Sequence, residues 1–170
     1  MDAVKNFKIA MTNWMCKHDF SNVELDFEYD FGYAIDEEND IHCINIGVAN
    51  CEDACNYFEQ FLYENGCEYT GIPYPVLCFL HELGHVRTID NFTQDELRVC
   101  RFIKAYGEEE EDYKYFTHYW MTPDEFAANM WAINFINENI EAVEELCMTF
   151  CAAWNTLTNN VNVFDLVSEE

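Results

Sequence analysis

The segment Val76–Thr88, which reads VLCFLHELGHVRT, constrains the fold of this chain more than any other. It places His81 and His85 four residues apart, with Glu82 between them, in a chain that has only five histidines. Residues i and i+4 of a helix share a face, so both imidazoles can reach one metal ion. The flanking residues are apolar, and polar groups buried there without a partner would be costly. The pattern therefore predicts a zinc site on a helix over residues 75–88, in preference to two core histidines that bond only to protein groups.

Glu82 is the candidate catalytic base. It lies beside the two histidines without sharing their face, so it is not expected to be a ligand. Zinc lowers the pKa of a water that it binds to about 7 in favourable sites, and a nearby carboxylate can take the proton. The HExxH pattern thus predicts two ligands and one general base for a hydrolytic reaction.

A catalytic zinc site usually has three protein ligands and one open position. The extended pattern HExxHxxGxxH is excluded, because Thr88 and Asn91 stand where it requires Gly and His. The third ligand must therefore come from further along the chain. The candidates are His118, Asp124, Glu125 and the acidic residues 108–112.

Glu125 is the preferred third ligand. It falls in the first turn of a predicted helix that begins at Pro123, with Thr122 as its N-cap. Ala128 and Ala132 lie near the Glu125 face, and their small side chains would let this helix approach another closely. An alternative remains open, since Thr122 and Glu125 also have the spacing of a capping box.

His118 is the main rival of Glu125 and is also a candidate catalytic residue. Instead of binding zinc, it could donate a hydrogen bond to the oxyanion of a tetrahedral intermediate. Three tyrosines nearby could do the same, and the sequence does not choose among them: Tyr113, Tyr115 and Tyr119.

HELGH (81–85) followed by EFAANMWA (125–132) resembles the pattern of the ImmA/IrrE-type zinc metallopeptidases. The resemblance covers about residues 75–135. It implies a zincin-like fold, with His81, His85 and Glu125 as zinc ligands and Glu82 as the base. This chain departs from the family pattern in two places: the long stretch between His85 and Glu125, and the INFINEN sequence that follows the start of the glutamate helix. Members of the family are bacterial or mobile-element proteins, including phage proteins, and some act on DNA-binding repressors.

The hydrophobic patterns predict one α+β domain over residues 1–170, mostly helical, with a small antiparallel sheet. Apolar residues alternate with acidic ones over residues 23–33, which predicts a half-buried strand, and residues 41–48 read as the returning strand. We expect a substrate peptide to lie along 41–48 as an edge strand beside the histidine helix. Helices are expected near residues 1–16, 50–64, 93–107, 122–136 and 140–156, and the acidic run 108–112 reads as a solvated loop.

Composition limits the partners. The chain carries 33 acidic and 8 basic residues, a net charge of −25, so its surface repels nucleic acid and favours basic protein or peptide partners. Half of the residues are hydrophobic, but we expect no membrane segment and no signal peptide, which predicts a cytoplasmic protein. The nine cysteines are then expected to be reduced thiols.

Two functions follow from these features. The first is a zinc-dependent endopeptidase that cuts a basic protein, such as a DNA-binding repressor. The second is an acidic protein that imitates DNA and binds a basic partner without catalysis, with its carboxylates spread along residues 23–33. The second requires no zinc and leaves HELGH without a role.

Overall fold

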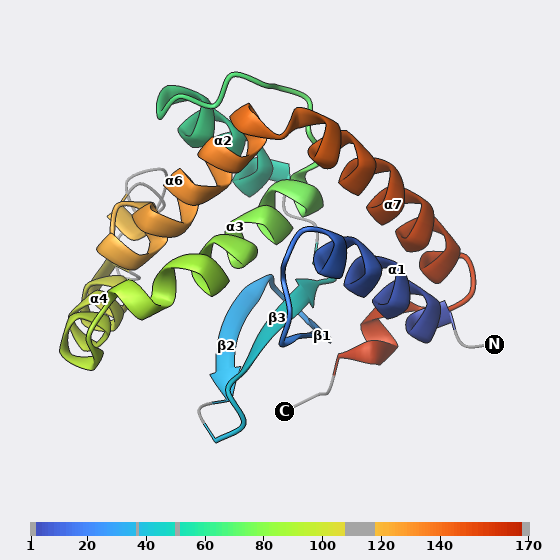
Figure 1. The fold of residues 1–170 in the computed structure, drawn as a ribbon, viewed down its shortest axis with the longest axis horizontal. Coiled ribbons are helices and arrows are strands. Elements are labelled where there is room, and N and C mark those ends of the chain that lie inside the picture. Colours follow the sequence, from blue (N-terminus) through green and yellow to red (C-terminus); the bar gives the residue numbers. More distant parts are fainter. Residues whose placement is uncertain (1–2, 37, 50–51, 108–117, 168–170) are drawn as a thin grey trace. The chain divides into compact units, whose positions relative to one another are not determined.

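The computed structural model describes residues 3–36, 38–49, 52–107 and 118–167. The chain is mostly helical with one small sheet, which confirms the α+β class (Figure 1). It forms two compact units, one made of residues 1–50 and 139–170 and the other of residues 51–138. Each unit is described by itself below, and the expected single domain stays a prediction.

The first unit combines a three-stranded sheet with helices from both ends of the chain. The strand order is β1-β3-β2, with β1 parallel and β2 antiparallel to β3. The elements of this unit are α1 (Ala3–Lys17), β1 (Val23–Glu28), β2 (Gly32–Asp36), β3 (Ile41–Gly47), α7 (Ile140–Thr158) and the 3-10 helix η2 (Val163–Leu166).

Three sequence predictions about this sheet are wrong. Residues 23–33 do not form one strand, because the chain leaves β1 after Glu28 and crosses the end of β3 before it begins β2. Gly47 allows that crossing, since a Cβ atom there would lie 2.6 Å from the Phe31 amide nitrogen. The sheet is therefore mixed and not purely antiparallel. It also follows that 41–48 contains the central strand β3, so this strand has no open edge for a substrate peptide.

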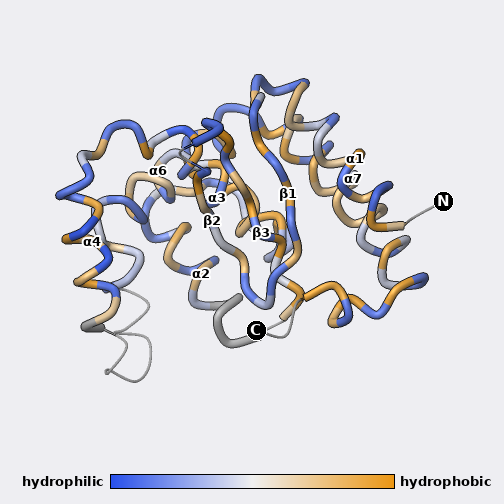
Figure 2. The backbone as a smooth tube through the Cα atoms, turned by 90° about the horizontal axis from the view of Figure 1, so that it is seen from below, coloured by the Kyte–Doolittle hydropathy of each residue, from blue (hydrophilic) through white to orange (hydrophobic). Residues whose placement is uncertain are grey.

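An aromatic cluster forms the core of the first unit. Phe7 of α1 is fully buried, and its ring centroid lies 5.5 Å from that of Phe27 on β1 and 5.4 Å from that of Phe150 on α7. The Trp14 indole also donates a hydrogen bond to the Ala142 carbonyl of α7. Hydrophilic and hydrophobic stretches alternate along α1 and β1, as Figure 2 shows, because each buries only one face.

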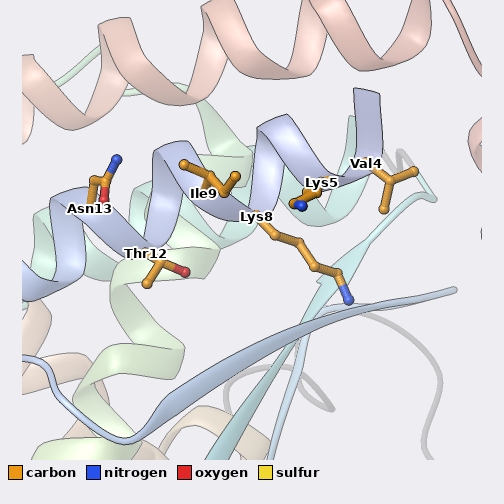
Figure 3. A pocket seen from close by; sticks show the side chains of 6 residues that line it. All are labelled: Val4, Lys5, Lys8, Ile9, Thr12 and Asn13. Atoms are coloured by element: carbon orange, nitrogen blue, oxygen red, sulfur yellow. The ribbon is translucent and has the colours of Figure 1, made fainter. Parts of the chain in front are cut away.

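A surface hollow of about 370 Å³ lies along α1 (Figure 3). The Lys8 side chain extends from it toward β1, where its ammonium nitrogen lies 3.2 Å from an Asp26 carboxylate oxygen. The lining contains no acid, histidine or cysteine, so this hollow has no catalytic or metal-binding group. The residues that line it are Val4, Lys5, Lys8, Ile9, Thr12 and Asn13.

The second unit is helical. Its elements are α2 (Glu52–Glu64), α3 (Tyr74–Thr88), the 3-10 helix η1 (Ile89–Asn91), α4 (Gln94–Gly107) and α6 (Pro123–Glu138). A capping box begins α4, since the Thr93 amide donates to Glu96 and the Glu96 amide donates to the Thr93 hydroxyl. Gly66, just after α2, has a positive φ of 101°, as the Asn-Gly ending of that helix predicts. Among the described residues, no helix combines the length and the apolar character needed to cross a bilayer.

The expected close approach of the helix that carries Ala128 is confirmed. Helices α3 and α6 pack together (Figure 1), and a Cβ atom built on Gly84 would lie only 2.4 Å from the Ala128 carbonyl oxygen. Ala128 and Ala132 are fully buried. The two backbones therefore touch at Gly84, within one turn of both histidines.

The first prediction concerns this contact. Gly84→Ala should lower the free energy of unfolding by about 1–3 kcal/mol, because α3 and α6 must separate to accept the methyl group. An alanine normally stabilises a helix relative to glycine, so the expected sign is the reverse of the ordinary one. Chemical denaturation measures the change.

Gly32→Ala is the matched control. A Cβ atom at Gly32 would lie 3.9 Å from the nearest side-chain atom, which is an ordinary contact. The control should change stability by no more than about 0.5 kcal/mol. A Gly84→Ala protein as stable as wild type would contradict the close packing of α3 and α6.

Candidate metal centre

Helix α3 carries the two histidines and begins where the sequence predicts. Pro73 precedes it with an extended ψ of 133°, and Pro75 falls in its first turn, where a missing amide hydrogen costs nothing. Every residue from Val76 to His85 is buried. The polar residues of HELGH therefore lie inside the second unit, where they need partners.

Helix α6 carries Glu125. It begins at Pro123, and both the amide and the hydroxyl of Thr122 bond to the Tyr119 carbonyl. The Glu125 carboxylate does not reach back to the Thr122 amide, so the capping-box alternative is wrong. Glu125 is instead 3% exposed and faces α3.

The two helices bring three ligand atoms together. Glu125 Oε2 lies 2.9 Å from His81 Nε2 and 3.4 Å from His85 Nε2. These atoms all lie within 4.8 Å of one another, and all three residues are buried. The predicted ligands His81, His85 and Glu125 thus form a group that could hold a metal ion.

The hydrogen bonding of His81 shows that this group fits a cation. Its Nδ1 lies 2.8 Å from the Asn129 side-chain oxygen, so Nδ1 carries the proton and donates it. In the neutral imidazole, Nε2 then presents a lone pair to Glu125 Oε2, a buried oxygen with no hydrogen-bond donor of its own. Two acceptors at such a distance repel each other unless a proton or a metal ion lies between them. A bound divalent cation satisfies both.

The contact between His81 and Glu125 also shifts the pKa values of both side chains. Burial opposes a charge on His81, but Glu82, Glu125 and Asn129 outweigh it and raise the pKa of His81 to about 9. Burial alone would raise the pKa of Glu125, but the two histidines hold it well below its usual range. Without a metal, a proton therefore takes the position between the two side chains, and a metal ion must displace it.

Glu82 lies in the same buried cluster and is 6% exposed. Burial raises its pKa, although the neighbouring His81 and His85 lower it in part. A carboxylate with a raised pKa is a stronger base than an exposed one, as a proton acceptor in hydrolysis requires. The Phe58 ring packs edge-on against the His81 imidazole with centroids 5.7 Å apart and forms an apolar wall of the cluster.

Sequence reasoning missed Lys104 of α4. Its ammonium nitrogen lies 2.5 Å from Glu125 Oε1 and 2.6 Å from Asp124 Oδ2. The Lys104 side chain is 18% exposed, and both carboxylates are more deeply buried. Asp124, one of the candidates for the third ligand, therefore pairs with Lys104 and is not among the converging ligand atoms. A lone lysine on an amphipathic helix gives no sequence signal for such a contact.

Among the three candidate tyrosines, the structure brings Tyr119 to the site. Burial and the neighbouring carboxylates of Glu125 and Glu82 raise its pKa, so its hydroxyl stays protonated. The Lys104 ammonium lies 5.1 Å from the centre of the Tyr119 ring. Tyr113 and Tyr115 lie outside the described residues, as do the acids 108–112.

His118 is helical and exposed. It is not part of the group of converging ligand atoms. Its proposed part in catalysis stays a prediction, whereas the fit of Glu125 favours the carboxylate as the third ligand.

The second prediction concerns metal content. The purified protein should bind one zinc ion per chain, and His81→Ala or His85→Ala should abolish binding. Glu125→Gln should weaken zinc affinity by about 10-fold or more, since even changes around the ligands cost about 10–100-fold. Competition with a coloured chelator measures these affinities.

Glu138→Gln removes an exposed carboxylate at the other end of α6 and should leave zinc affinity unchanged. Equal affinities for the Glu125→Gln and Glu138→Gln proteins would show that Glu125 is not a ligand. A large loss in His118→Ala would then assign that role to the rival histidine.

Comparison of the chain with protein-family models, curated proteins and solved structures finds no significant match. The assignment of a function therefore depends on the arrangement of the buried cluster.

Proposed function

We propose that this protein is a zinc-dependent endopeptidase of zincin-like design. The observation that carries the proposal is the buried group of His81, His85 and Glu125, with the carboxylate of Glu82 beside it. A site that only stabilises the fold needs no base, and the two-histidine, one-carboxylate set is typical of hydrolytic zinc. The resemblance to the ImmA/IrrE-type metallopeptidases supports the same reaction.

Zinc bound there would polarise the scissile carbonyl and make a water acidic enough to react near neutral pH. Glu82 accepts a proton as the water oxygen bonds to the carbonyl carbon. It then returns that proton to the leaving amine as the C–N bond breaks. Two neutral imidazoles and one carboxylate would leave a bound zinc ion with a net charge of about +1, which would preserve its strength as a Lewis acid.

We propose a basic protein or peptide as the substrate class. The chain has a net charge of −25, and Glu24 and Asp26 are exposed along β1. Such a surface speeds encounter with cationic partners and repels nucleic acid. A DNA-binding repressor would meet this description, and the family resemblance favours it.

The alternative is an acidic protein that binds a basic partner without cutting it. The exposed acids of β1 would serve it equally well. The binding-only alternative does not explain why two buried histidines face a carboxylate, so we prefer the peptidase.

The third prediction tests the base. Glu82→Gln should retain the zinc and the fold but lower the rate of peptide cleavage by about 100-fold or more, since an amide cannot accept the proton. Incubation with a library of peptides derived from a digested proteome, followed by mass spectrometry, reports every new cleavage site.

Two comparisons control this experiment. Glu138→Gln should cleave as wild type does, and a chelator should stop cleavage in both. Cleavage that persists in Glu82→Gln would exclude Glu82 as the base, and a wild-type protein that binds the zinc but cuts no peptide would favour the binding-only alternative.

A further inference from the structure

The two oxygens of Glu125 have different partners. Oε2 faces the two imidazoles, and Oε1 lies 2.5 Å from the Lys104 ammonium. The Glu125 side chain is only 4% exposed, so water does not compete freely for either oxygen. The orientation of this carboxylate is therefore decided by Lys104 on one side and by the histidines on the other.

Lys104 is itself held from several sides. Its ammonium nitrogen forms a second ion pair with Asp124, with Oδ2 at 2.6 Å. The same nitrogen lies 5.1 Å from the centre of the Tyr119 ring. These contacts hold the lysine between its own helix α4 and the first turn of α6.

We propose that Lys104 is a positioning residue that reserves Oε1 and leaves only Oε2 for the metal. This inference rests on the proposed zinc site. A carboxylate can bind a metal through one oxygen or through both, and a catalytic zinc site requires an open position beside three protein ligands. By occupying Oε1, Lys104 prevents Glu125 from filling that position with its second oxygen.

Cobalt(II) provides a test that does not depend on catalysis. Four-coordinate cobalt absorbs visible light much more strongly than five- or six-coordinate cobalt, so its spectrum reports how many ligands it has. Wild-type protein loaded with cobalt should show intense bands, Lys104→Met should show weaker ones, and Lys104→Arg should retain the wild-type spectrum because it keeps the cation. An unchanged spectrum in Lys104→Met overturns the proposal.

Zinc affinity separates this role from a merely structural one. Lys104→Met should bind zinc at least as tightly as wild type, because a neighbouring positive charge has been removed and a second oxygen has become available. A loss of about 10-fold or more, the size expected when the support of a ligand fails, overturns the proposal. Lys8→Met, which removes an exposed ion pair to Asp26, is the matched control and should change neither measurement.

If Lys104→Met fails to fold, Lys104→Gln replaces it with the same expectation. Glutamine is uncharged and one atom shorter, so it cannot reach both carboxylates, and an unchanged cobalt spectrum again overturns the proposal.

A wild-type protein that takes up no cobalt or zinc overturns the metal site itself. A wild-type protein that binds metal without cutting peptides leaves the role of Lys104 intact and contradicts only the peptidase.

Discussion

The contact between α3 and α6 at Gly84 is the constraint on which the candidate site depends. A side chain larger than hydrogen at this position would collide with the Ala128 backbone, so only glycine lets the helices approach this closely. That approach brings the Glu125 carboxylate to 2.9 Å from the His81 imidazole. The same pair of helices also places Asn129 of α6 against the far nitrogen of His81. The packing of two backbones therefore brings the three candidate ligands together and fixes the orientation of the His81 imidazole.

A buried cluster of this kind is stable only if its charges balance. Glu82, Asp124 and Glu125 are all less than a tenth exposed, and Lys104 supplies one positive charge. The position between the imidazoles and Glu125 requires another cation, because an acceptor faces an acceptor there. A proton fills it when no metal is bound, and a metal ion that binds there must displace that proton. Metal binding and protonation are thus expected to compete at His81.

The part of the site that is local in sequence could be predicted. The spacing of His81 and His85 gives their common face, and Pro123 gives the start of α6 and so the place of Glu125 in its first turn. Lys104 could not be predicted, because its contact with α6 depends on how two helices pack and leaves no periodic signal. The division of residues 23–33 into two strands could not be predicted either, for a similar reason. Alternation specifies the faces of a strand but not its partner, and the crossing at Gly47 depends on contacts distant in sequence.

The central claim is that His81, His85 and Glu125 hold zinc, and X-ray absorption at the zinc edge tests it most directly. The nine cysteines of the chain are the strongest competing zinc ligands, and sulfur scatters differently from nitrogen and oxygen. Our account predicts a first shell of nitrogen and oxygen alone at about 2.0–2.1 Å, with the outer-shell scattering of two imidazoles. A shell of sulfur at about 2.3 Å would place the metal on cysteines and contradict the account.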